Sequence, residues 1–215
     1  MPSRAEILQT LGLVSNEQAI LAIIWHILAA VAVIAILFGW RPSKKLGAAA
    51  LSIPPLSVSV IAWIYKNPFN GLVFLLLAVI LAVIGLRRPS EKVDVAPVWA
   101  RVAGVGLVII GWVYPHFLTG GTWLKFLYRA PTGLIPCATL SLTIGFALLA
   151  NGFSSRAWSI ILGAVGLFYG LTGVFSLKVT IDLVLLAGAI ALLVLTFTPR
   201  FSAFSAAGRK QKAAA

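Results

Sequence analysis

The stretch "AILAIIWHILAAVAVIAILFGW", residues 19–40, carries no charged residue, and His26 is its most polar side chain. A helix that crosses the ~30 Å hydrocarbon core of a membrane needs about 20 predominantly apolar residues, and six further runs in the chain approach this length. The sequence therefore predicts an all-α bundle of about seven transmembrane helices. They are expected near residues 18–40, 46–65, 70–87, 97–114, 133–151, 157–176 and 178–197.

The composition supports this class. Hydrophobic residues make up 60% of the 215 residues and charged residues 10%, with a mean hydropathy of +1.03, whereas soluble domains have roughly 25% charged residues. The single cysteine, Cys137, excludes an intramolecular disulfide. The net charge of +12 is scattered between apolar runs and forms no basic stripe, so nucleic acid is not an expected partner.

The basic residues also predict the orientation, because cytoplasmic loops are enriched in Lys and Arg. Twelve of the 17 would lie on one side of the membrane and five on the other. We therefore expect a multi-pass protein of the inner (plasma) membrane, with the N-terminus outside and the C-terminus in the cytoplasm. One transmembrane domain (18–198) would follow an N-terminal segment (1–17), which is either an amphipathic surface helix or a frayed tail, and precede a basic tail (199–215).

The notable polar side chains gather in the outer half of the predicted bundle. An intramembrane carboxylate such as Asp182 costs about 2.5–3.5 kcal/mol at the bilayer centre, less near the surface, and so needs a partner or a wet cavity. One hypothesis is an outward-facing polar cavity that binds a small solute or a proton. The alternative is a local pair between Asp182 and Lys178, one helical turn away. The candidate ligand-binding residues are His26, Tyr114, His116, Pro136, Cys137, Thr139, Tyr169, Lys178 and Asp182.

No cofactor is expected. His26 and His116 could in principle clamp a haem, and Cys137 could complete a metal site with them, but the chain has no Cys-x-x-Cys-His motif and no His-x-x-x-His pair. The favoured interpretation of His26 is a hydrogen bond to a neighbouring helix.

Prolines inside two of the spans predict irregular helices. Pro54 and Pro55 should kink or interrupt the second span, and Pro136 should do the same near the start of the fifth. In lipid the freed backbone groups must be satisfied by hydroxyls, water or neighbouring helices. Such breaks either line a binding site or simply shape the packing. The hydroxyls placed to help are those of Ser52, Ser57, Ser59, Thr139 and Ser141.

Small residues mark one face of the sixth span. Gly166 and Gly170 have Gly-x-x-x-Gly spacing, and Gly163 and Gly173 extend the face. Such a face allows close packing of another helix, either of the same chain or of a partner in a homo- or hetero-oligomer. In the longest loop, "TWLKFLYR" at 122–129 is either an aromatic anchor or a lid over the outer cavity.

A possible repeat joins the first four spans. "RPSKK" at 41–45 recurs as "RPSEK" at 88–92, and "AWIY" at 62–65 recurs as "GWVY" at 111–114. These matches indicate either a duplicated hairpin or the residue preferences of membrane interfaces.

The segments "YPHFLTGG", "APTGLIPCATLSLTIGFALL" and "SLKVTIDLVLLAGAIALLV" resemble an uncharacterised bacterial family of small polytopic membrane proteins. That family is marked by Tyr-Pro before the outer loop and by a Gly-x-Pro-Cys-Pro-Thr-Thr segment that opens a helix; some members carry the name of a permease. In this chain Ala138 replaces the second proline, and one extra residue separates Gly133 from Pro136. The resemblance implies a shared fold and no established activity. The positions that match the pattern are Tyr114, Pro115, Gly133, Pro136, Cys137, Thr139 and Asp182.

The sequence thus favours a permease-like or small-ligand-binding protein. A non-catalytic partner subunit or assembly factor is the alternative, and a haem- or quinone-binding redox subunit is a further one. An enzyme is not expected, because the chain has only five acidic residues and neither a Gly-x-Ser-x-Gly motif nor a phosphate-binding loop.

Overall fold

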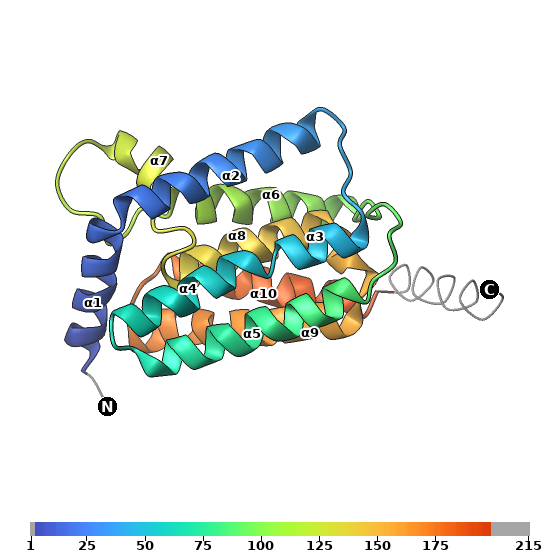
Figure 1. Cartoon of the computed structure of the whole chain (residues 1–215). Coiled ribbons are helices and arrows are strands. Elements are labelled where there is room, and N and C mark those ends of the chain that lie inside the picture. The colour runs from blue at the N-terminus through green and yellow to red at the C-terminus, as the bar shows by residue number, and fades with distance from the viewer. Residues whose placement is uncertain (1–2, 199–215) are drawn as a thin grey trace.

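The computed structural model describes residues 3–198, and its regular elements over that range are all helices (Figure 1). The expected tail, 199–215, lies outside the described residues. The α-helices are α1 (Arg4–Glu17), α2 (Ala19–Leu37), α3 (Lys44–Ala50), α4 (Ile53–Ile64), α5 (Pro68–Leu86), α6 (Val98–Val113), α7 (Phe126–Arg129), α8 (Pro136–Leu149), α9 (Arg156–Leu171) and α10 (Asp182–Thr196). Three short turns join them: η1 (Trp123–Lys125), η2 (Asn151–Ser154) and the π-helical η3 (Thr172–Ser176).

Each of the seven predicted ranges contains a helix, but the helices differ in length. Four stretches are long and apolar enough to cross a membrane: Ala19–Leu37, Lys44–Ile64, Pro68–Leu86 and Arg156–Ser176. The helices Val98–Val113, Pro136–Leu149 and Asp182–Thr196 are shorter; at 1.5 Å per residue the 14 residues of α8 extend about 21 Å. The structure therefore supports an all-α, membrane-type bundle with four candidate spans.

α8 occupies the middle of the bundle. It packs against α4, α6, α9 and α10, and nearly all of its side chains are buried. The α6–α8 contact is close because glycines face each other's backbones: a Cβ on Gly111 would lie 2.5 Å from the Leu142 nitrogen, and one on Gly104 would lie 2.8 Å from the Gly145 oxygen. The core of the bundle is thus built around α8, a helix with little surface exposed outside the protein.

The glycine face of the sixth predicted span lies against α10 of the same chain. A Cβ on Gly163 or Gly166 would meet Leu193 or Ala189, and one on Gly170 would lie 2.9 Å from the Leu186 Cα. The small residues therefore permit close packing of α9 and α10, and Gly173 makes room for Asp182 in the same way.

The N-terminal segment is a helix. Ser3 caps α1 in a capping box with Glu6. Hydrogen bonds from the Ser3 backbone and side chain lower the pKa of the exposed Glu6 carboxyl. In Figure 1, α1 lies across the ends of the other helices. Arg4 donates to the Leu177 carbonyl between α9 and α10, so α1 covers this end of the bundle and is not a frayed tail.

Pro54 and Pro55 interrupt the second span, as predicted. α3 ends at Ala50, and α4 begins at Ile53 with the prolines in its first turn. The Ser52 nitrogen and hydroxyl both donate to the Ala49 carbonyl, at 3.1 and 2.6 Å. Pro136 was expected to break its helix as well, but it is the first residue of α8; a proline there removes a backbone donor that has no helical partner in any case.

Candidate functional site

The structure brings together part of the predicted outer site. Tyr114 ends α6 and Asp182 begins α10, and the Tyr114 hydroxyl donates to Asp182 Oδ1 at 2.6 Å. The Cys137 thiol, in the first turn of α8, is an electrostatic neighbour of the Asp182 carboxylate. We call Tyr114, Cys137 and Asp182 the outer cluster. Tyr114 and Asp182 are each 1% exposed, while Cys137 keeps part of its surface accessible.

The alternative pairing of Asp182 with Lys178 is wrong. The recorded ion pairs within residues 3–198 join Lys44 to Glu91 and to Asp94, and Lys178 lies exposed in a left-handed conformation with φ of 58°. Asp182 accepts a hydrogen bond from the uncharged Tyr114 hydroxyl instead.

His26 lies apart from the outer cluster and connects two helices. Its Nδ1 is 2.8 Å from the Ala22 carbonyl oxygen and its Nε2 is 2.9 Å from the Trp112 carbonyl oxygen on α6. The expected interhelical contact is therefore present. Both ring nitrogens face backbone oxygens, so a haem or metal ion would have to displace one of these contacts. His116 is exposed and packs edge-on against Phe117.

Thr139 and Tyr169 hold backbone and side chains in place. The Thr139 hydroxyl accepts from the Gly133 nitrogen at 2.9 Å and donates to the Ile135 carbonyl, which fixes the turn that leads into α8. The Tyr169 hydroxyl donates to Asn70 Oδ1 at 2.7 Å. Ser141 differs from the expectation for the hydroxyls: its buried oxygen has no hydrogen-bond partner in the described part of the chain.

A small pocket lies near the start of α8. It has a volume of about 20 Å³ and lies between α1, α4 and the start of α8, with Pro136, Tyr65 and Asn70 in its lining. That volume holds about one water molecule. None of Tyr114, Cys137 and Asp182 lines this pocket, so the small outward-facing polar cavity stays a prediction. The lid over the pocket is α1, whereas the predicted lid, residues 122–129, has exposed aromatic side chains at Trp123 and Tyr128 that suit a membrane interface.

Asn16 ties α1 to the outer loop. Its side-chain amide donates to the Phe117 carbonyl at 2.9 Å, and its side-chain oxygen accepts from the Thr119 nitrogen at 3.1 Å. Arg129 donates to the Asn16 carbonyl. These bonds keep the outer end covered.

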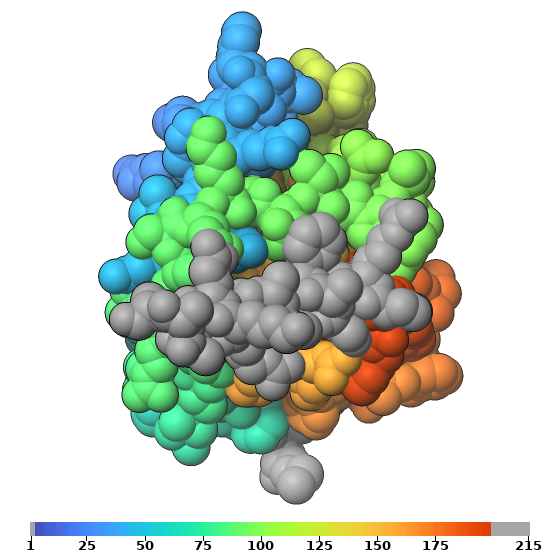
Figure 2. Space-filling model, turned by 90° about the vertical axis from the view of Figure 1, so that its right-hand side faces the viewer, coloured from blue at the N-terminus to red at the C-terminus, as the bar shows by residue number. Residues whose placement is uncertain are grey.

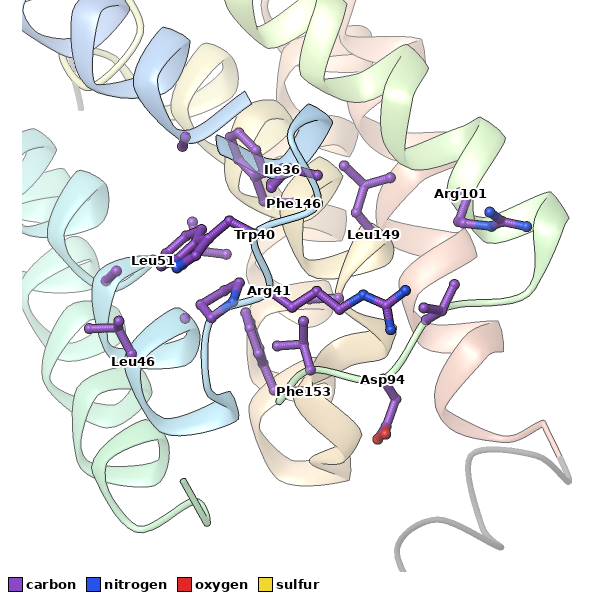
Figure 3. A pocket seen from close by; sticks show the side chains of 18 residues that line it. Ile36, Trp40, Arg41, Leu46, Leu51, Asp94, Arg101, Phe146, Leu149 and Phe153 are labelled. Carbon is purple, nitrogen blue, oxygen red and sulfur yellow. The ribbon is translucent and has the colours of Figure 1, made fainter. Parts of the chain in front are cut away.

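A larger pocket lies at the opposite end of the bundle, where sequence reasoning placed no site. Its volume is about 420 Å³, and it lies between the second half of α2, α3, and the end of α8 (Figure 3). Figure 2 looks onto this end of the molecule. The lining is mostly apolar, with Arg41, Asp94 and Arg101 as its charged members.

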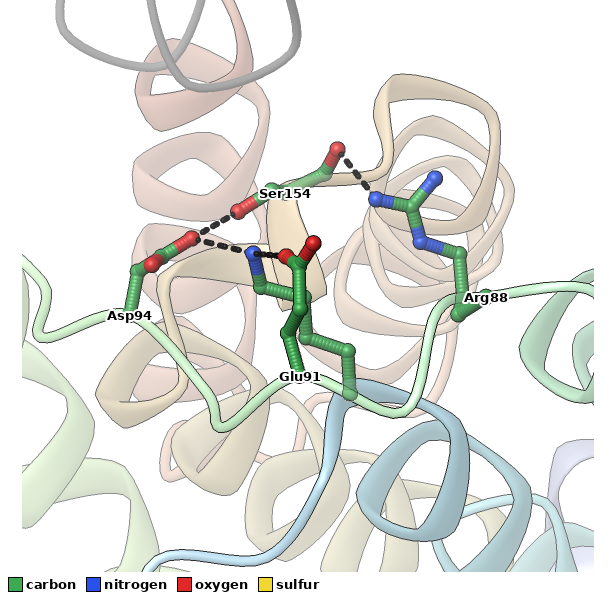
Figure 4. A network of polar contacts seen from close by, with 5 residues as sticks. Arg88, Glu91, Asp94 and Ser154 are labelled. Carbon is green, nitrogen blue, oxygen red and sulfur yellow. Dashed lines mark hydrogen bonds and ion pairs between the residues drawn. The ribbon is translucent and has the colours of Figure 1, made fainter. Parts of the chain in front are cut away.

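A polar network borders this pocket (Figure 4). The Lys44 ammonium, 8% exposed, lies 2.9 Å from Asp94 Oδ2 and 3.2 Å from Glu91 Oε2. The Ser154 hydroxyl donates to Asp94 at 2.5 Å, and Arg88 donates to the Ser154 carbonyl at 3.1 Å. Burial of the Arg88 guanidinium lowers its pKa, and the carboxylates of Glu91 and Asp94 oppose part of that shift.

The two repeated "RPS" segments meet in this network. Ser43 and Lys92 form an antiparallel bridge, with the Lys44 nitrogen 2.7 Å from the Glu91 oxygen and the Val93 nitrogen 3.0 Å from the Pro42 oxygen. The similar segments therefore lie side by side and close the first two hairpins against each other.

The backbone at η2 is strained. Asn151, Gly152, Phe153 and Ser154 are four successive residues with φ between 49° and 56°. The left-handed conformation costs about 1–2 kcal/mol for a residue with a Cβ, and such strain often occurs at functional sites. Here it places Phe153 edge-on against Trp158 at 4.9 Å and directs Ser154 into the polar network. The pair "NG" at 151–152 is the one local signal of this turn in the sequence.

Comparisons with known proteins add no assignment: no family model, curated protein or solved structure matches the chain.

Proposed function

We propose that the chain is a multi-pass protein of the bacterial inner membrane with a permease-like role, in which the outer cluster binds a small solute or a proton. The observation that carries this proposal is the Asp182 carboxyl group, which is 1% exposed, accepts a hydrogen bond from the Tyr114 hydroxyl and forms no ion pair among the described residues. An acidic group buried in a membrane protein without a cationic partner is a functional-site candidate.

The proposal includes seven membrane-crossing helices with the N-terminus outside. The short length of α8 is compatible with this number. Because α8 is surrounded by other helices, it does not have to match the full thickness of the lipid. The basic residues at the loops after α2 and α5 support the orientation.

The geometry of Asp182 supports binding of a positively charged or hydrogen-donating species. Its Oδ1 accepts from Tyr114, and its Oδ2 faces Gly173 in the π-helical turn η3. π-turns are frequent at functional sites. The neighbouring tyrosine and thiol are uncharged and do not neutralise the Asp182 carboxylate. A proton or a small donor group bound at Oδ2 would offset that negative charge.

Exchange with the outside would require α1 and the loop after α6 to move. The Asn16 hydrogen bonds and the Arg4–Leu177 contact hold these segments over the cluster. Any oligomer formed through α9 would use its exposed side, which includes Phe168 and Leu171, because its glycines already pack against α10.

The test uses the single cysteine. Intact cells that express the protein are treated with a membrane-impermeant maleimide, with SDS-denatured protein as the labelling control and Cys137→Ser as the blank. We expect slow labelling of Cys137 in the wild type and faster labelling in Tyr114→Phe, which loses the hydrogen bond to Asp182. If both proteins stay unlabelled while the denatured control reacts, solutes do not reach the cluster from outside and the proposal is refuted.

The orientation is tested in the Cys137→Ser background. Thr180→Cys and Arg87→Cys place exposed thiols at the two ends of the bundle. We expect the impermeant reagent to label only Thr180→Cys in intact cells and both variants after permeabilisation. The opposite pattern would reverse the orientation.

A further inference from the structure

Polar contacts in its first half hold α2 to the bundle, together with apolar packing of Ala29 and Val33 against Val108 and Leu142. The pocket of about 420 Å³ lies beside the remainder of its second half. Trp25 donates to the Ser57 hydroxyl at 3.0 Å, His26 contacts the Trp112 carbonyl, and Gln18 donates to Tyr65. In Figure 1 the second half of α2 runs away from α3 and α8. The pocket occupies this gap, between Ala32 and Ile36 on one side and Phe146 and Leu149 on the other.

The surroundings of the pocket indicate a hydrocarbon occupant. Its lining is dominated by aliphatic and aromatic side chains, and its volume is within the range of small-molecule sites. The neighbouring residues Leu37, Phe38 and Leu46 are exposed and apolar, so in a membrane the pocket would border on lipid.

The mouth of the pocket carries positive charge. Arg41 and Arg101 are exposed members of its lining (Figure 3), and neither takes part in an ion pair within residues 3–198. The remaining charged member, Asp94, lies 2.9 Å from the Lys44 ammonium and is therefore compensated. Trp40, at the same mouth, is a residue type enriched at the membrane–water boundary.

We propose that this pocket binds an anionic phospholipid, with one acyl chain between α2 and α8 and the phosphate between Arg41 and Arg101. Basic pockets between transmembrane helices suit anionic head groups. The chain's own C-terminal segment fits less well, because residues 199–215 contribute Arg200, Arg209, Lys210 and Lys212 and no acidic residue. This inference is independent of the outer cluster.

The experiment measures the melting temperature of the purified full-length protein in a non-ionic detergent. Dioleoylphosphatidylglycerol and dioleoylphosphatidylcholine are titrated separately, and glycerol 3-phosphate provides the head group without a chain. A lipid that binds the folded state raises the melting temperature. We expect a saturable rise with phosphatidylglycerol, a much weaker response to phosphatidylcholine and none to glycerol 3-phosphate.

Two variants and a matched control locate the site. Arg41→Gln/Arg101→Gln should raise the half-saturating phosphatidylglycerol concentration roughly tenfold to thirtyfold. Ala50→Phe, which fills the pocket from α3, should abolish the response while both arginines remain. Lys45→Gln/Arg87→Gln removes two exposed basic residues at the same end that do not line the pocket and should leave the titration unchanged.

Three results would overturn the proposal. The first is an equal rise in melting temperature with phosphatidylglycerol and with phosphatidylcholine. The second is an equally weakened phosphatidylglycerol response in Arg41→Gln/Arg101→Gln and in the control Lys45→Gln/Arg87→Gln, which would indicate general surface attraction. The third is a phosphatidylglycerol response that appears only after residues 199–215 are deleted, which would mean that the chain's own terminus fills the pocket.

Discussion

Replacing Gly173 by alanine should disrupt the outer cluster directly. A Cβ at this position would lie 1.9 Å from Asp182 Oδ2 and 2.7 Å from Asp182 Cγ, so the carboxyl group must move and its 2.6 Å bond to Tyr114 must lengthen or break. Overpacking costs about 1–3 kcal/mol, and loss of a hydrogen bond to a charged group costs about 1.5–3 kcal/mol. Together we expect about 2.5–6 kcal/mol.

The assay is thermal unfolding of the purified protein in detergent. For a chain of this length each kcal/mol shifts the melting temperature by about 2–4 °C, so Gly173→Ala should melt about 5–24 °C lower than the wild type. Gly106→Ala is the matched control, because Gly106 lies within α6 and has no atom within 4 Å of an added Cβ. It should melt at the wild-type temperature or slightly above, since alanine favours a helix over glycine by about 1 kcal/mol.

A double variant decides whether Asp182 is the cause. Asp182→Gly removes all three side-chain atoms that a Cβ on Gly173 would meet, at 1.9, 2.7 and 2.8 Å, so adding Gly173→Ala to that background should cost less than about 1 kcal/mol. If the full loss persists without the carboxyl group, the close approach of Gly173 to Asp182 does not explain the destabilisation, and the assigned role of this glycine is wrong.

Two further pairs of variants test the fold by the same assay. Gly133→Ala adds a Cβ 2.2 Å from Trp25 to a residue with φ of +76°, whereas Gly120→Ala, at φ of +66°, meets nothing within 4 Å. Backbone strain alone should cost Gly120→Ala about 1–2 kcal/mol and Gly133→Ala clearly more; equal losses would contradict the packing of Trp25 on this turn. Lys44→Met removes the partner of the partly buried Asp94 and should lower the free energy of unfolding by about 1–3 kcal/mol. The matched change Lys45→Met, at an exposed lysine, should alter it by no more than about 0.5 kcal/mol. Similar values for both variants would mean that the ion pair contributes little.

The positions of the helices follow from the sequence because long apolar runs leave few alternatives. Every predicted range contains a helix, and the break at Pro54 and Pro55 follows from the missing backbone donors. Pro136 was misjudged because its effect depends on register. The same residue breaks a helix from within and starts one at the first position, and the apolar run from Gly133 gave no sign of where the helix begins.

The outer cluster was partly predictable for a similar reason. Polar residues at equal depth on different helices are brought together when the helices pack, and this holds for Tyr114, Cys137 and Asp182. Which residue pairs with Asp182 was not predictable from spacing, because Lys178 is near in sequence but turns outward at a left-handed residue. Tyr114 is 68 residues away in sequence and is placed by the contact between α6 and α10.

The large pocket was not predictable, because it depends on where an apolar helix leaves its neighbours. Lipid chains are as apolar as the side chains of α2, so there is little hydrophobic driving force to hold such a helix against the bundle. Polar contacts and close packing then decide where it is held, and α2 has its polar anchors only in its first half, at Gln18, Trp25 and His26. From Ile27 to Phe38 the sequence is apolar throughout, and nothing in it distinguishes a helix packed on protein from one packed on lipid. The same reasoning predicts that a new polar contact between the second half of α2 and α8 would narrow the pocket and weaken its response to phospholipid.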